Sequence, residues 1–161
     1  MRKEAMITLN DIKEAKKRLT GTVLTTPLVK APILSKELNT QVYLKEDNLQ
    51  LTGSFKIRGA FNRLASMDEI KRKNGVVAAS AGNHAQGVAL AAKKLGIKAT
   101  IFMPVGASLP KLQATENYGA EVVLTGSVFN ETLKAAQAHA AKKGAIFIPP
   151  YDHIDVVLGQ G

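Results

Sequence analysis

The 161-residue sequence contains no cysteine, and this absence excludes disulfide bonds, thiolate metal sites and a cysteine nucleophile. It also lacks the roughly 18 consecutive apolar residues that a membrane-spanning helix needs, and its start, Met1 to Thr8, has no apolar signal-peptide core. These absences predict a cytoplasmic protein without a membrane partner. Any covalent chemistry must use another side chain, and lysine is the first candidate.

Acidic and aromatic residues are scarce. The chain has 13 acidic against 22 basic residues, a net charge of +9, and only 5% aromatic residues. The basic residues are spread along expected helix faces without the interleaved aromatic side chains that stack nucleic-acid bases, so no nucleic-acid partner is predicted. The three histidines lack metal-ligand spacing, so no metal site is predicted.

The first half of the chain alternates short regular segments with proline interruptions. Thr8 and Asp11 form a capping-box pattern that predicts a first helix. Two proline-containing segments, Thr25-Thr26-Pro27 and Ala31-Pro32, are expected to interrupt regular structure. Residues 42–44 are expected to form a strand. A second helix is expected to start near Ser54 and to bury Ile57, Ala60, Phe61 and Leu64.

After Gly75 the pattern becomes regular. Short apolar segments predict strands at residues 76–79, 99–103, 121–124 and 145–148. Amphipathic segments between them, ended by glycines, predict helices at residues 83–95, 108–118 and 128–143. This order predicts an α/β fold with a parallel four-stranded sheet, flanking helices and right-handed crossovers. Four aromatic residues are assigned to core positions: Tyr43, Phe61, Phe102 and Phe147.

The first chemical motif is T-G-S-F-K-I-R-G-A at residues 52–60. Ser54 suits a helix N-cap, which would place Lys56 in the first helical turn, where the positive end of the helix dipole disfavours an ammonium. Partial burial beside Phe55 would also favour the neutral amine that imine formation with an aldehyde requires. The alternative is an ordinary surface lysine near a helix start.

The second motif is S-A-G-N-H-A-Q-G at residues 80–87, between an expected buried strand and a helix. Small residues at the turn and free N–H groups at a helix start favour a carboxylate or phosphate, and open α/β sheets bind ligands at the carboxyl ends of strands. Asn83 can hydrogen-bond a ring hydroxyl, and His84 is assigned a supporting role. The alternative is a tight strand-to-helix turn capped by Asn83.

Together the two motifs closely resemble the threonine dehydratases, which are fold-type II pyridoxal-phosphate enzymes. The resemblance covers nearly the whole chain. It includes I-x-x-A-x-x-R-L in the first helix, V-Y-L-K-x-E-x-x-Q before the lysine, I-F-M-P, Y-G-A-E-V-V-L, and I-P-P-Y-D near the end.

The resemblance implies roles for individual residues. Lys56 would bind pyridoxal 5'-phosphate covalently and move the substrate Cα proton, Asn83 would hydrogen-bond the cofactor's phenolic oxygen, and Phe55 would flank its ring. The substrate carboxylate would be received by the loop of Ser80, Ala81, Gly82, Asn83 and His84. The implied reaction is dehydration and deamination of L-threonine to 2-oxobutanoate and ammonia, with L-serine as a poorer substrate giving pyruvate. It would serve isoleucine biosynthesis or threonine catabolism in a homo-oligomeric enzyme.

The sequence leaves three other functions open. Serine racemases look similar across both motifs but have a second serine where this chain has Ala81, so a second proton carrier is missing here. Cysteine synthases resemble the fold but have a T-S-G-N-T-G-type loop. A rival from another class is a non-catalytic remnant or interaction module.

The resemblance also implies a domain division. Residues 1–50 would begin the larger domain, residues 51–152 would form the smaller α/β domain, and residues 153–161 would return to the larger domain. The apolar periodic segment from Ile154 stops at Gly161 without a polar tail, which predicts an interrupted chain. The family's phosphate loop and the residue at its pyridine nitrogen would lie beyond Gln160, so the isolated chain is expected to be inactive.

Overall fold

The computed structural model describes residues 7–161, so the first six residues of the predicted 1–50 segment, and most of the start from Met1 to Thr8, lie outside the described residues. Helix α1 spans Leu9–Leu19. The Thr8 hydroxyl accepts from Asp11 N–H while the Asp11 carboxylate accepts from Thr8 N–H, which confirms the predicted capping box.

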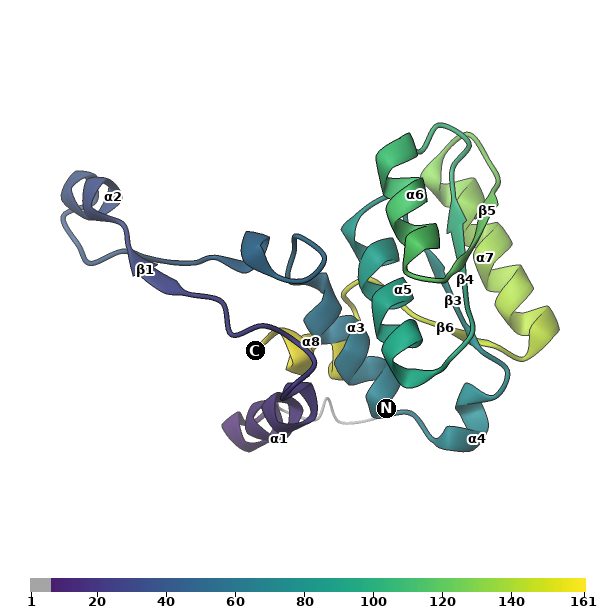
Figure 1. The fold of residues 1–161 in the computed structure, drawn as a ribbon, viewed down its shortest axis with the longest axis horizontal. Helices are drawn as coiled ribbons and strands as arrows, with labels where there is room; N and C mark the ends of the chain where they lie inside the picture. Colours follow the sequence, from purple (N-terminus) through teal and green to yellow (C-terminus); the bar gives the residue numbers. More distant parts are fainter. Residues whose placement is uncertain (1–6) are drawn as a thin grey trace, which may run out of the picture.

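An arm projects from the rest of the molecule (Figure 1). It contains an antiparallel pair, β1 (Leu28–Lys30) and β2 (Tyr43–Lys45), with α2 (Pro32–Glu37) between the strands and a 3₁₀ turn at Asp47–Leu49 after them. The expected interruption at Ala31-Pro32 ends β1 at Lys30, but Pro32 also begins α2, a helix that was not expected, because proline at the first helical position loses no N–H bond. Tyr43 is 49% exposed, so its predicted core position is also wrong.

The predicted parallel sheet is confirmed, with strand order β5-β4-β3-β6. Its strands are β3 (Val76–Ala79), β4 (Ala99–Met103), β5 (Glu121–Leu124) and β6 (Ile146–Phe147). β3 is buried along its whole length because helices cover both sides of the sheet. All four carboxyl ends therefore meet at one edge.

Two cores lie on opposite faces of the sheet. Helices α5 (Asn83–Leu95) and α6 (Leu109–Asn117) cover one face, and α7 (Phe129–Lys143) covers the other (Figure 1). Val76 and Ala78 join the core on the α5 side, whereas Val77 and Ala79 join the core beneath α7. This alternation follows from the two-residue period of a strand. Phe102 and the half-buried Phe147 pack in the α7 core, and Phe61 packs in the α5 core.

Helix α3 (Lys56–Ala65) joins the sheet domain to the terminal helices α1 and α8 (Ile154–Gln160), and the short α4 (Glu69–Arg72) follows it. Asn62 is fully buried between them: its side-chain oxygen accepts from Arg18 Nε at 2.8 Å, and its amide donates to the Asp155 carbonyl at 2.6 Å. Because both polar ends are paired, the buried amide is tolerated. Within residues 7–161, no helix is both long and apolar enough to cross a membrane.

Candidate functional site

Lys56 is the first residue of α3, so its predicted place in the first helical turn is confirmed. The predicted cap is wrong, because Phe55 occupies the N-cap position and the buried Ser54 hydroxyl has no hydrogen-bond partner within residues 7–161. Lys56 Nζ donates to the Pro150 carbonyl at 2.9 Å and lies 5.1 Å from the centre of the Phe55 ring. Burial lowers the pKa of Lys56, which favours the neutral, nucleophilic amine.

The residues of the second motif follow β3 directly. Ser80 N–H donates to the Phe102 carbonyl of β4 at 3.0 Å, and the Ser80 hydroxyl accepts from Gly82 N–H at 3.1 Å, so one bond to β4 and one within the turn hold its backbone. Helix α5 begins at Asn83, whose side chain is exposed, with Gly82 as its N-cap. This confirms the predicted strand-turn-helix geometry, and the exposed α5 N-terminus suits an anion.

His84 is the buried member of this loop. Its Nε2 lies 3.0 Å from the Ile148 carbonyl, and its Nδ1 has no partner among the described residues. Burial lowers the pKa of His84 to about 4, and the charge of Lys56 acts in the same direction. The ring is therefore neutral near pH 7, and Nε2 carries the hydrogen that it donates to Ile148.

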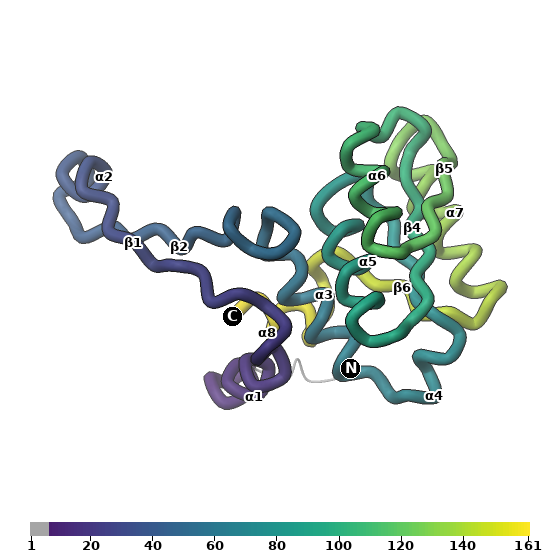
Figure 2. Tube along the Cα trace, in the orientation of Figure 1, coloured from purple at the N-terminus to yellow at the C-terminus, as the bar shows by residue number. Residues whose placement is uncertain are grey.

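The carbonyls of Ile148 and Pro150 bring the two motifs together. They lie in the segment that leaves β6, and one accepts from His84 while the other accepts from Lys56. Sequence reasoning gave this segment no role, although its two consecutive prolines signal a chain that cannot continue as a sheet strand. Figure 2 shows this segment passing from the sheet towards α3 and α8.

The titration of His84 makes stability depend on pH. Because folding lowers the pKa of His84 from 6.5 to about 4, the unfolded chain binds more protons than the folded chain between these values. Above pH 6.5 both states keep His84 neutral, and the folded protein has its full stability from this residue. As the pH falls to 4, about 3 kcal/mol of unfolding free energy should be lost.

Urea unfolding between pH 4 and 7.5 measures this loss. Burial also lowers the pKa of His153, so the measurement compares the chain with His84→Gln, which can still donate to Ile148. The slope between pH 4 and 6.5 should be smaller in the variant. Equal slopes would contradict the neutral, buried state assigned to His84.

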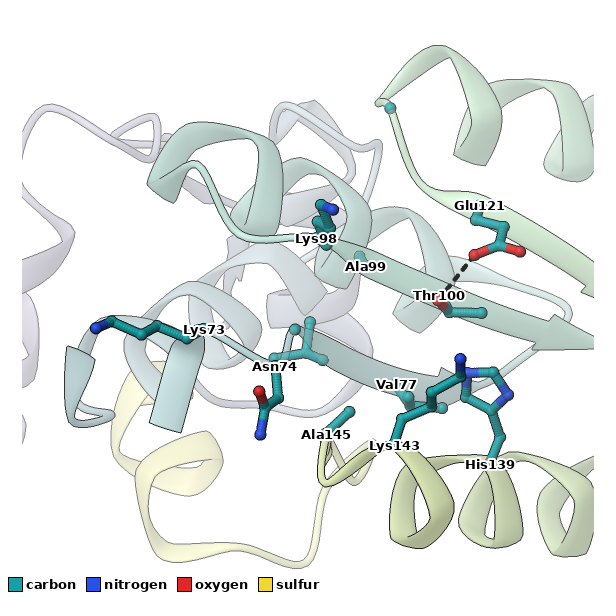
Figure 3. A pocket seen from close by; sticks show the side chains of 13 residues that line it. Lys73, Asn74, Val77, Lys98, Ala99, Thr100, Glu121, His139, Lys143 and Ala145 are labelled. Carbon is teal, nitrogen blue, oxygen red and sulfur yellow. Dashed lines mark hydrogen bonds between the residues drawn. The ribbon is translucent and has the colours of Figure 1, made fainter. Parts of the chain in front are cut away.

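A cavity of about 570 Å³ lies elsewhere (Figure 3). It is bordered by the amino ends of β3, β4 and β5, whereas Lys56 and the loop lie at the carboxyl ends. His139 and Lys143 line it beside Thr100, whose hydroxyl donates to the Glu121 carboxylate at 3.2 Å. Helix carboxyl ends surround this cavity, and their partial negative charge explains the lysines there.

A smaller cavity of about 240 Å³ adjoins Lys56. Its lining includes Phe55, Pro150, Tyr151, Val156 and Val157. These mostly apolar groups exclude water from one side of the amine, which is the physical cause of its lowered pKa. No group of three or more histidine, aspartate or glutamate side chains that could hold a metal was found in the part of the chain that the structure describes.

Comparison with known proteins yields a consistent group. The family profile described as pyridoxal-phosphate dependent enzyme matches residues 19–161. The chain is 53% identical over 156 residues to the L-threonine ammonia-lyase of Thermotoga maritima, covering 97% of this chain and 39% of that protein. It is 47% identical over 155 residues to the catabolic L-threonine dehydratase of Escherichia coli, covering 96% and 47%.

A solved structure is also close in fold. Maize serine racemase superposes with a TM-score of 0.89 at 30% sequence identity, covering 96% of this chain and 47% of the other. The chain thus spans less than half the length of these relatives. The similarity supports the fold-type II architecture expected from the motifs, while the names of these relatives include both a lyase and a racemase activity.

The residues around Lys56 fit the cofactor that this family description implies. A half-buried amine with a lowered pKa matches an aldehyde partner, and the adjacent Phe55 ring offers a planar apolar surface. The Ser54 hydroxyl, for which the described part of the chain supplies no hydrogen-bond partner, is a further polar group in the same turn. Asn83 lies at the start of the neighbouring helix α5, with its amide exposed. The described residues thus offer an amine, an aromatic face and hydrogen-bonding groups to this cofactor.

Proposed function

The chain belongs to the family of pyridoxal-phosphate-dependent enzymes, and from this membership we propose that the protein is an L-threonine ammonia-lyase. The reaction converts L-threonine into 2-oxobutanoate and ammonia, with L-serine as a poorer substrate giving pyruvate. The observation that carries the proposal is the joint placement of Lys56 and loop 80–84, which the carbonyls of Pro150 and Ile148 hold at one edge of the sheet.

Bound pyridoxal phosphate would supply an aldehyde for the lysine and a ring that accepts the electron pair left at the substrate Cα. Lys56 would hold the cofactor and then take the Cα proton on Nζ, for which its lowered pKa is suited. Asn83 would hydrogen-bond the ring hydroxyl, and Phe55 would flank the ring. Loop 80–84, with Ser80, Ala81, Gly82 and His84, would orient the substrate through its carboxylate.

Ala81 favours elimination over racemisation. Racemisation needs a second proton carrier on the opposite face of the substrate, and a methyl side chain cannot carry a proton. The high similarity to maize serine racemase makes this the specific rival activity. The 53% identity to an L-threonine ammonia-lyase supports the lyase.

The test uses the natural-length protein, loaded with pyridoxal phosphate. We expect 2-oxobutanoate from L-threonine, slower pyruvate formation from L-serine, and no D-serine. D-serine formation faster than 2-oxobutanoate formation would replace the proposal with a racemase. Turnover of neither substrate would reject both activities and favour the non-catalytic interaction module.

The same proposal includes the domain division 1–50, 51–152 and 153–161. The arm supports it, because several large apolar side chains there are exposed, among them Leu28, Ile33 and Leu38 at 63% or more. Such surfaces are usually covered by further protein. Assembly of the whole enzyme into a homo-oligomer and a cytoplasmic location stay predictions from the resemblance.

A further inference from the structure

Lys111 is a basic side chain to which neither motif assigns a role, and it reaches loop 80–84 from a different helix. It lies in the first turn of α6, whose N-cap is Ser108. A methyl group built on Gly82 would lie 3.4 Å from Lys111 Nζ, so the ammonium rests against the loop. Because β3 and β4 are parallel neighbours, the helices that follow them begin at the same edge of the sheet.

A lysine at this position is unfavourable for the stability of α6. The first turn of a helix carries partial positive charge, which favours acidic side chains and disfavours a lysine. Lys111 takes part in none of the four ion pairs found within residues 7–161, so no carboxylate there offsets this cost. Departures from local preference of this kind concentrate at functional sites.

Hydrogen bonds fix the backbone at the start of α6, and with it the Cα from which the Lys111 side chain extends. Lys111 N–H donates to the Ser108 carbonyl at 3.0 Å. Its own carbonyl accepts from the Thr115 hydroxyl at 2.8 Å, and Thr115 is fully buried. The half-buried Lys111 side chain then extends to Gly82, 29 positions earlier in the chain.

We propose that Lys111 determines specificity for the anionic carboxylate of the amino-acid substrate. The ammonium would add a charge-assisted hydrogen bond to those from the N–H groups of loop 80–84. The inference rests on the proposed function, because that function places the carboxylate in the loop. It extends the carboxylate site from one strand-helix junction, at β3 and α5, to the neighbouring junction at β4 and α6.

The test compares Lys111→Gln and Lys111→Arg in the natural-length, cofactor-loaded protein, with Lys134→Gln on the exposed side of α7 as the control. Loss of one charge-assisted hydrogen bond predicts a rise in KM for L-threonine of about tenfold or more in Lys111→Gln. The kcat should change much less, because the carboxylate is bound equally before and during the reaction. The arginine variant should stay within about threefold of the unsubstituted protein, since it keeps the charge.

Calorimetric binding of L-threonine and of its methyl ester, in which the carboxyl group carries no charge, separates recognition of the carboxylate charge from a structural effect. Lys111→Gln should weaken binding of the acid and leave binding of the ester unchanged. An unchanged KM, or equal losses for acid and ester, would overturn the inference. If the unsubstituted protein does not turn over L-threonine, the proposed lyase function fails on its own. The acid-over-ester preference then still decides the inference: loss of that preference in the variant supports it, and retention overturns it.

Discussion

Lys56→Ala should abolish covalent attachment of pyridoxal phosphate and lower the rate of 2-oxobutanoate formation by at least about 10³-fold. Among residues 7–161, Lys56 is the amine that combines a lowered pKa, an aromatic neighbour and a place at the sheet's carboxyl edge, and the variant removes it. General acid-base groups alone contribute about 10²–10⁴-fold to enzymatic rates, and Lys56 would also hold the cofactor. Borohydride reduction followed by peptide mass spectrometry measures the attachment site.

Two further variants sharpen this result. Lys56→Arg keeps the positive charge but cannot supply a neutral amine, so it should be as inactive as the alanine variant. Lys94→Ala, on an exposed lysine near the end of α5, should keep the attachment and the rate. A labelled peptide that contains another lysine, or an active Lys56→Ala protein, would refute the role assigned to Lys56.

Gly87→Ala should lower the rate by about tenfold to a hundredfold while the protein remains folded. Gly87 lies where α5 crosses the first turn of α3, and an added Cβ would meet the Lys56 carbonyl carbon at 3.0 Å and the Ile57 nitrogen at 3.1 Å. These are backbone atoms, so they cannot rotate away, and the two helices must separate. Displacement of a reacting group by about 1 Å can cost about 10²-fold in rate.

The control for this variant is Gly106→Ala, because an added Cβ at that position meets no atom within 4 Å. Overpacking at Gly87 should cost about 1–3 kcal/mol of unfolding free energy, partly offset by about 1 kcal/mol from the higher helix propensity of alanine. Urea unfolding gives the stability and the threonine assay gives the rate. A Gly87→Ala rate equal to that of Gly106→Ala would mean that this helix contact does not position Lys56.

The exposed arm shows where prediction from the sequence failed. Proline at residue 32 was expected to interrupt regular structure, but proline fits the first helical position as well as a loop, so its identity alone could not separate these outcomes. Tyrosine is frequent in strands that pack against a core, and Tyr43 does lie in a strand. Every residue of β1 and β2 is nevertheless exposed. Burial depends on what packs against a segment, which a local pattern does not contain.

The sequence by itself determined the parallel sheet, the bounds of its helices within one or two residues, and the two motifs with Lys56 and Asn83. Strand periodicity, glycine stops and caps act over a few residues, so they can be recognised in the chain directly. Only the tertiary structure placed the Pro150 carbonyl on Lys56, the Ile148 carbonyl on His84 and the Lys111 ammonium against Gly82. These contacts join residues 94, 64 and 29 positions apart, and they depend on how the helices pack across the edge of the sheet, which no local pattern specifies.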